Sequence, residues 1–236
     1  AMFYSGFSEE DKVRLYSVFG GIPYYNRLID AKKSVRENII ELIASSGARL
    51  ENEVSMYLNS EISKITNANE VFEALAKGFS RYKDILDRSN VSSGPALVDI
   101  LDKLMRMDVV AKEAPINDEN NRKKSGYFIS DNLSLFYYKY IFRNMSRMNI
   151  MDPDIFYDRY IADDFETKYI PKCFERICKQ YLIRKEPITE SIVQNEIRQV
   201  KQTGLECYRY GFFSRSGFTC EEGTNRILIE LRELYK

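Results

Sequence analysis

The stretch LSLFYYKYIF, residues 133–142, decides how this chain of 236 residues folds. Aromatic and aliphatic side chains occupy nearly every position, so a helix formed here has almost no polar face. A helix that is apolar all round is buried among other elements. Asp131 stands just before it, where an N-terminal cap is expected. The tyrosines could instead stack on nucleic-acid bases. They are interleaved with aliphatic residues at core spacing, and we therefore favour a core helix.

Upstream of this helix, residues 66–130 show three helical patterns followed by two strand patterns. Asn67 and Glu70 are placed to cap the first helix, and Pro95 begins the third, whose apolar face includes Leu101. The strands are expected at residues 109–111 and 127–129, on either side of a polar stretch. Three helices followed by a hairpin are typical of a winged-helix domain, although other small α+β units share this order.

Residues 1–65 are expected to form a small helical module. Ser8 caps a first helix, and the pair Gly20 and Gly21 ends it by allowing positive φ. Ser34 and Glu37 form the pattern of a capping box in front of an apolar helical face.

The third region, residues 131–236, begins with connecting helices and ends in a mixed pattern. A kink is expected at Pro171, and the next predicted helix points Ile192, Val193 and Ile197 inward. Residues 207–213 and 227–231 are predicted strands, with a terminal helix as the alternative for the second. The fold class is therefore mainly α with α+β parts.

Composition excludes several classes of site. Lys plus Arg and Asp plus Glu both number 35, so nucleic-acid contact would need a local basic patch. The chain has no histidine, which excludes histidine triads and histidine zinc sites. Its four cysteines form no C-x-x-C pair, which favours reduced thiols in a cytoplasmic protein. No apolar run reaches the length of a membrane span.

Several blocks, in consistent order, together resemble one known family. They are YSVFGGIPYY at residues 16–25, LENE at 50–53, YLNSE at 57–61, YFISDN at 127–132, FERIC at 174–178 and GFFSRSGF at 211–218. The family is that of archaeal and bacterial AAA+-type ATPases with a C-terminal nuclease-like domain of unknown function. The resemblance implies a helical ATPase lid over residues 1–65, a winged helix over 66–130, and a truncated restriction-endonuclease-like α/β end within 131–236.

The chain departs from this family in its ATPase core. It has no G-x-x-x-x-G-K-[ST] loop to cradle phosphates. We therefore expect the nucleotide-binding domain to lie N-terminal to this region, with ATP and magnesium bound only by the full-length protein and no cofactor bound by this chain.

A second departure concerns the nuclease chemistry. In the family, acidic residues and a lysine on two strands converge on a divalent metal, which activates water. Here only residues 183–187 separate the flanking helices, so no strand pair fits between them. Around Arg184 this segment is either truly deleted from the protein or present in the protein and only absent from this sequence, and we favour the second. Glu175 matches the helix glutamate that sometimes completes the metal site, but alone it cannot hold a metal, and we predict no metal site.

The predicted winged helix contains the candidate DNA-binding residues. Its third helix exposes Asp99 and Asp102 beside two basic residues, so this helix carries no net charge. The DNA-binding candidates are Lys83, Arg88, Lys103, Arg106, Arg122, Lys123 and Lys124. Because phosphate contacts usually need surplus Lys or Arg, we favour a protein-docking winged helix over a DNA-binding one.

Two glycine-containing loops are further candidates. Ser214, Arg215 and Ser216 could bind an anion, or the segment could be a strand-exit turn that needs Gly217. The loop at residues 20–23 lacks the lysine of a phosphate-binding loop, which favours a structural turn between helices.

These observations lead to three functional hypotheses. The first is a non-catalytic regulatory or effector region of an ATPase that binds DNA or a protein partner, self-association included. The second is a metal-dependent nuclease whose catalytic strands are absent from this sequence. The third is a purely structural interaction module.

Overall fold

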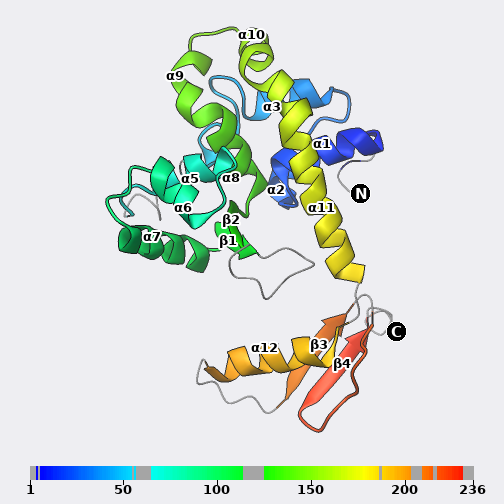
Figure 1. The fold of residues 1–236 in the computed structure, drawn as a ribbon. Coiled ribbons are helices and arrows are strands. Elements are labelled where there is room, and N and C mark those ends of the chain that lie inside the picture. Colours follow the sequence, from blue (N-terminus) through cyan, green and yellow to red (C-terminus); the bar gives the residue numbers. More distant parts are fainter. Residues whose placement is uncertain are drawn as a thin grey trace. The chain divides into compact units, whose positions relative to one another are not determined.

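The computed structural model describes residues 4, 6–54, 56, 65–113, 125–185, 188–202, 209–214 and 217–230. The described chain is mostly helical and contains two two-stranded sheets (Figure 1). It divides into two compact units, Ala1–Phe174 and Glu175–Lys236. The module boundaries predicted at residues 65 and 130 fall inside the first unit and stay predictions. Over the described ranges, no helix combines the length and the apolar character that a bilayer crossing needs.

The chain begins with helices α1 (Glu9–Phe19), α2 (Pro23–Asn26) and α3 (Val35–Leu42). The hydroxyl of Ser8 accepts a hydrogen bond from the backbone N–H of Asp11, as expected for an N-terminal cap. Gly20 ends α1 with φ of 62°. The capping box of Ser34 and Glu37 is present in full. The caps at Ser8 and Ser34 and the stop at Gly20 are therefore confirmed, whereas Gly21 does not adopt the positive φ predicted for the glycine pair.

The middle of the first unit has the predicted order of three helices and a hairpin (Figure 1). Its helices are α5 (Ala68–Ala76), α6 (Tyr82–Arg88) and α7 (Gly94–Arg106). Strands β1 (Val110–Glu113) and β2 (Gly126–Ile129) pair antiparallel, with Val110 opposite Ile129. The N–H of Tyr127 also donates to the carbonyl of Ser80 at 2.8 Å. The turn between α5 and α6 therefore lies along the free edge of β2.

The predicted cap at Asn67 is wrong in its chemistry. Asn67 precedes α5, but its side chain makes no capping hydrogen bond. It adopts a left-handed conformation with φ of 63°, and its side-chain amide donates to the carbonyl of Asn90. Asn tolerates this conformation better than most residues, so its role here is to shape the turn.

The aromatic stretch is buried, as its sequence predicts. Helix α8 (Asn132–Phe136) is capped by Asp131 and continues into a π-helical turn, Tyr137–Ile141, instead of remaining α-helical throughout. Phe136 and Ile141 are fully buried, and Tyr138 stacks on Phe72 of α5 at 4.8 Å between ring centroids. These buried rings form part of the core and are not available to nucleic-acid bases.

The rest of the first unit is a run of short helical segments. They are the 3₁₀ turn Phe142–Asn144, α9 (Met145–Met148), α10 (Pro153–Tyr157) and the π-helical turns Asp158–Ala162 and Phe165–Tyr169, followed by α11 (Ile170–Lys185). The kink predicted at Pro171 stays a prediction; a π-helical turn ends just before this residue, which lies in the first turn of α11. Proline has no N–H for the carbonyl four residues back, and a π turn changes the hydrogen-bond register at that point.

The second unit contains α12 (Glu190–Gln202), β3 (Tyr210–Ser214) and β4 (Arg226–Glu230). The two strands pair parallel, with Tyr210 opposite Arg226. The predicted strands are therefore confirmed over residues 210–213 and 227–230, and the alternative of a terminal helix is wrong for the described residues.

One expectation about α12 is wrong. Val193 and Ile197, four residues apart, are buried, whereas Ile192 is 47% exposed. Positions i and i+4 share one helical face, and Ile192 lies to the side of it.

Candidate functional site

The turn at residues 20–24 is an exposed feature held in a fixed shape. The carbonyl of Gly20 accepts hydrogen bonds from the Tyr4 hydroxyl and from the Asn26 side-chain amide, both at 3.2 Å. The Tyr4 hydroxyl also bonds the side-chain oxygen of Asn26, and burial raises the pKa of Tyr4 well above its ordinary value. On the outside of the turn, Ile22 is 40% exposed and Tyr24 is 55% exposed. Two large apolar side chains thus stand on a rigid base.

The same region of α1 is tied to distant parts of the first unit. The side-chain amide of Asn132, in α8, donates to the carbonyl of Tyr16 at 2.7 Å. The hydroxyl of Tyr169 donates to the carbonyl of Ser17 at 2.8 Å. The Tyr16 carbonyl also accepts the capping N–H of Gly20 at 2.9 Å, so Asn132 gives it a second hydrogen bond. Both side-chain donors lie over 100 residues away in the sequence. The 20–24 turn is therefore fixed to α8 and to the π-helical turn before α11.

Two of the predicted DNA-binding residues have partners in the described chain. Lys103 forms an ion pair with Asp99 at 2.7 Å, and the Arg88 guanidinium lies 5.0 Å from the centre of the Phe79 ring. Lys83 and Arg106 are exposed on α6 and α7. The remaining candidates, Arg122, Lys123 and Lys124, lie outside the described residues.

The second unit contains Glu175, the candidate remnant of a metal site. Glu175 is exposed on α11. Within the ranges that the structure describes, no three Cys, Asp or Glu side chains come together to hold a metal ion. Only residues 186–189 separate α11 from α12, so these two helices leave no room for a catalytic strand pair between them.

Ser214, at the end of β3, is hydrogen-bonded to Gly217. The buried hydroxyl of Ser214 donates to the carbonyl of Gly217 at 2.7 Å, and Gly217 has φ of 85°. A positive φ explains the glycine without an anion. These contacts favour the strand-exit turn over anion binding for Ser214, while Arg215 and Ser216 lie outside the described residues.

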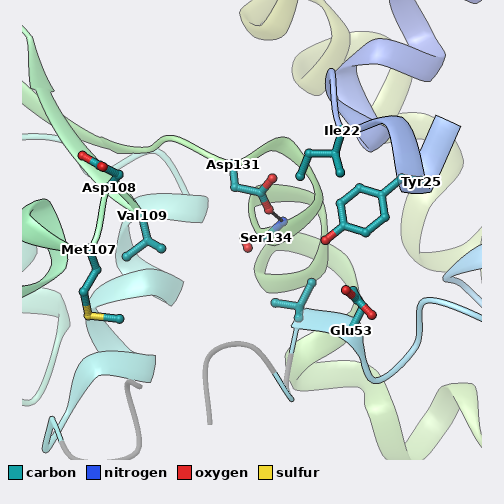
Figure 2. Close-up of a pocket in the computed structure, with 9 residues that line it drawn as sticks. Ile22, Tyr25, Glu53, Met107, Asp108, Val109, Asp131 and Ser134 are labelled. Atoms are coloured by element: carbon teal, nitrogen blue, oxygen red, sulfur yellow. Dashed lines mark hydrogen bonds between the residues drawn. The ribbon is translucent and has the colours of Figure 1, made fainter. Parts of the chain in front are cut away.

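A pocket of about 250 Å³ lies in the first unit where four segments meet (Figure 2). Ile22 and Tyr25 come from α2 and the turn before it, and residues 53–54 and 107–109 supply further walls. Asp131 and Ser134 come from the start of α8, where the Asp131 carboxylate accepts the Ser134 N–H at 2.7 Å. Sequence reasoning identified Asp131 as a cap but missed the pocket, because no local pattern brings these segments together.

Two carboxylates outside the pocket, the buried Glu73 and the half-buried Asp164, link helical segments of the first unit. Burial by itself raises the pKa of Glu73, but hydrogen bonds from Arg143 and Lys77 outweigh it and hold the pKa below its ordinary value. Asp164 follows the same pattern, with Lys139 and the Tyr140 hydroxyl as partners. Both groups are stabilised as carboxylates in the folded protein.

We expect the free energy of unfolding to fall in acid because of these groups. A lowered pKa in the folded state contributes stability above the unfolded-state pKa of about 4, and that stability is lost as the pH falls through the folded-state value. Replacing Glu73 with Gln should lower the free energy of unfolding by about 1 kcal/mol at pH 7, because Arg143 and Lys77 are themselves solvent-exposed. The difference should shrink toward pH 3. Urea unfolding between pH 3 and 7 measures it, with the exposed Glu10→Gln as control. Parallel pH curves for wild type and Glu73→Gln would contradict the assignment.

Comparison with known proteins gives two matches. Residues 137–202 match the family DUF234, described as archaeal and bacterial proteins of unknown function. The chain is also similar to an uncharacterized protein of Methanocaldococcus jannaschii, with 28% identity over 174 residues. That alignment covers 74% of this chain and 38% of the relative, so the chain spans well under half of the archaeal protein's length. No solved structure matches.

Proposed function

We propose that this chain is a non-catalytic regulatory region of a larger ATPase and acts through protein contacts. The observation that carries the proposal is the 20–24 turn. Ile22 and Tyr24 are exposed although large and apolar, while the backbone beneath them is fixed by Tyr4 and Asn26. Apolar side chains held outward on a rigid base suit a surface that another protein part covers. The turn lies in the segment that resembles an ATPase lid, and the part that covers it is proposed to be the nucleotide-binding domain.

The contacts of α1 support a coupling role for this turn. Asn132 and Tyr169 bond carbonyls in the last turns of α1, close to Gly20. A displacement of the turn would therefore disturb α8 and the buried aromatic core. Such a contiguous network of packed and hydrogen-bonded groups is a physical route for coupling between sites.

The face of α7 favours a protein partner over DNA. Val98 is 46% exposed, and Asp99 and Asp102 are exposed beside it. Lys103 is held by Asp99, so it would have to leave an ion pair to reach a phosphate. DNA affinity depends on neutralising phosphates with Lys or Arg. A neutral helix with an exposed apolar residue fits a protein surface better.

Titration with a fluorescent DNA duplex tests this choice. We expect the anisotropy to show weak binding at 50 mM salt that Lys103→Ala and Arg106→Ala leave unchanged. Tight binding that falls about 10³-fold or more between 50 and 200 mM salt would contradict the proposal. Loss of such binding on neutralising Arg122, Lys123 and Lys124 would assign the surface to DNA.

A second candidate function is that of a metal-dependent nuclease, and the parallel pairing of β3 and β4 favours it. Parallel strands occur mostly in larger sheets covered on both faces. The pair is therefore proposed to belong to a larger nuclease-like sheet whose catalytic strands this sequence lacks. Magnesium-dependent DNA cleavage by the full-length protein would support this function, and its absence would exclude it.

A further inference from the structure

We propose that the pocket between α2, α8 and the turn after α7 binds a small organic cation, in which a protonated amine is attached to an apolar body. The pocket shares Ile22 with the 20–24 turn, but the proposal does not rest on the ATPase role, and its test requires only the present chain.

The size and the lining of the pocket indicate which apolar group of a ligand would fit. A volume of about 250 Å³ equals the liquid volume of about eight water molecules. Val54 and Val109 are almost fully buried in its walls, and Met107 lies beside Val109. A body the size of one aromatic ring with a short tail fits this space and replaces water at apolar walls.

The charges around the pocket indicate that the ligand is positively charged. The acidic residues that line the pocket are Glu53, Asp108 and Asp131, and no Lys or Arg lines it among the described residues. In the described chain, no Lys or Arg forms an ion pair with Glu53 or Asp108. Figure 2 shows the Asp108 carboxylate turned away from the Ser134 side, so it acts at longer range. A cleft lined by one sign of charge concentrates ions of the opposite sign.

These carboxylates do not form a metal site. No group of three acidic or thiol side chains in the described residues converges closely enough to ligate an ion. Asp131 already accepts the Ser134 N–H. A divalent metal needs several oxygen ligands at close range, whereas an ammonium needs one or two acceptors and tolerates more distant charges. The geometry therefore favours an organic cation.

Ser134 gives independent evidence that the pocket takes a polar ligand. Only 2% of this residue is exposed, and it lines the pocket. Its backbone N–H bonds Asp131, and no hydrogen bond holds its hydroxyl among the described residues. In that part of the chain only the Ser89 hydroxyl is fully buried without a partner, so the Ser134 hydroxyl is open to the pocket. An ammonium in the pocket would donate to this oxygen, with Glu53 supplying charge at the rim and Tyr25 a second hydroxyl (Figure 2).

The test compares three probes that share a phenylethyl group and differ in the charge of the head group. Phenethylamine, 2-phenylethanol and 3-phenylpropionate carry a positive, neutral and negative head, and backbone amide NMR shifts report where each binds. We expect phenethylamine to shift the amides of residues 107–109 and 131–134. The alcohol should bind about threefold more weakly, as expected for loss of one partly exposed charge interaction, and the acid should not bind. Equal affinities for amine and alcohol, or shifts elsewhere, would overturn the proposal.

Variants distinguish binding in the pocket from binding elsewhere on the surface. Glu53→Gln and Ser134→Ala should each weaken phenethylamine binding about threefold, while Asp87→Asn, an exposed carboxylate on α6, should leave it unchanged. Ser134→Ala keeps the N–H that Asp131 caps, so the fold is retained. If Ser134→Ala leaves amine binding unchanged, the hydroxyl takes no part and the proposal fails. Tighter binding of an acetylated, amidated lysine peptide than of phenethylamine would assign the same cation site to a partner's lysine.

Discussion

Replacing Phe136 with Ala is expected to lower the free energy of unfolding of the first unit by about 3–5 kcal/mol. Phe136 is fully buried at the end of α8. Its ring lies 5.0 Å from that of Tyr140, 6.1 Å from that of Phe165 and 5.9 Å from that of Tyr169, measured between centroids. Removing it leaves a cavity among three rings from two helical segments, and such a cavity adds to the lost transfer free energy.

The matched control is Phe174→Ala, because Phe174 is 50% exposed. The control should change the stability of the first unit by no more than about 0.5–1 kcal/mol. Urea unfolding followed by far-UV circular dichroism gives both values, provided that the slope with urea stays constant. Equal losses for the two variants would contradict a core centred on the aromatic stretch.

Replacing Gly20 with Ala is expected to lower the free energy of unfolding by about 1–3 kcal/mol, because the backbone at this position favours glycine. Its φ is 62° and its ψ is −153°. A methyl group at this position would have room, since its nearest contact is the Asn132 Cβ at 3.7 Å. The cost therefore comes from backbone strain and not from a clash.

Gly21→Ala is the matched control in the same turn. Gly21 does not have a positive φ, and an added Cβ would meet Tyr16 at an ordinary 3.9 Å. We expect its effect on the melting temperature to be small or slightly stabilising. Similar losses of stability for Gly20→Ala and Gly21→Ala would show that Gly20 does not have the positive φ on which this prediction rests.

The sequence predicted the elements whose signals are local. Ser8, Ser34 and Asp131 cap helices as expected, since each bonds an N–H only three residues away. The burial of residues 133–142 also followed from composition, because no face of that helix suits water. The cap predicted at Asn67 was wrong, because the residue types that cap helices also stabilise turns.

Features that depend on distant segments were not predictable. The pocket combines residues 22–25 with residues 131–134, and no pattern in one segment reveals the other. The hydrogen bonds from Asn132 and Tyr169 to α1 span 116 and 152 residues. The ion pair of Lys103 with Asp99 could have been predicted from the sequence, because residues four apart share a helical face.

ATP turnover by the full-length protein tests the central claim most directly. The comparison is between wild type, the double variant Ile22→Ser with Tyr24→Ser, and the control Ile155→Ser, whose side chain is exposed on α10. If the 20–24 turn couples this region to a nucleotide-binding domain, the double variant should change turnover by about fivefold or more, the lower end of typical coupling between sites. The control should match wild type. Unchanged turnover in the double variant, or a full-length protein that hydrolyses no ATP, would contradict the account.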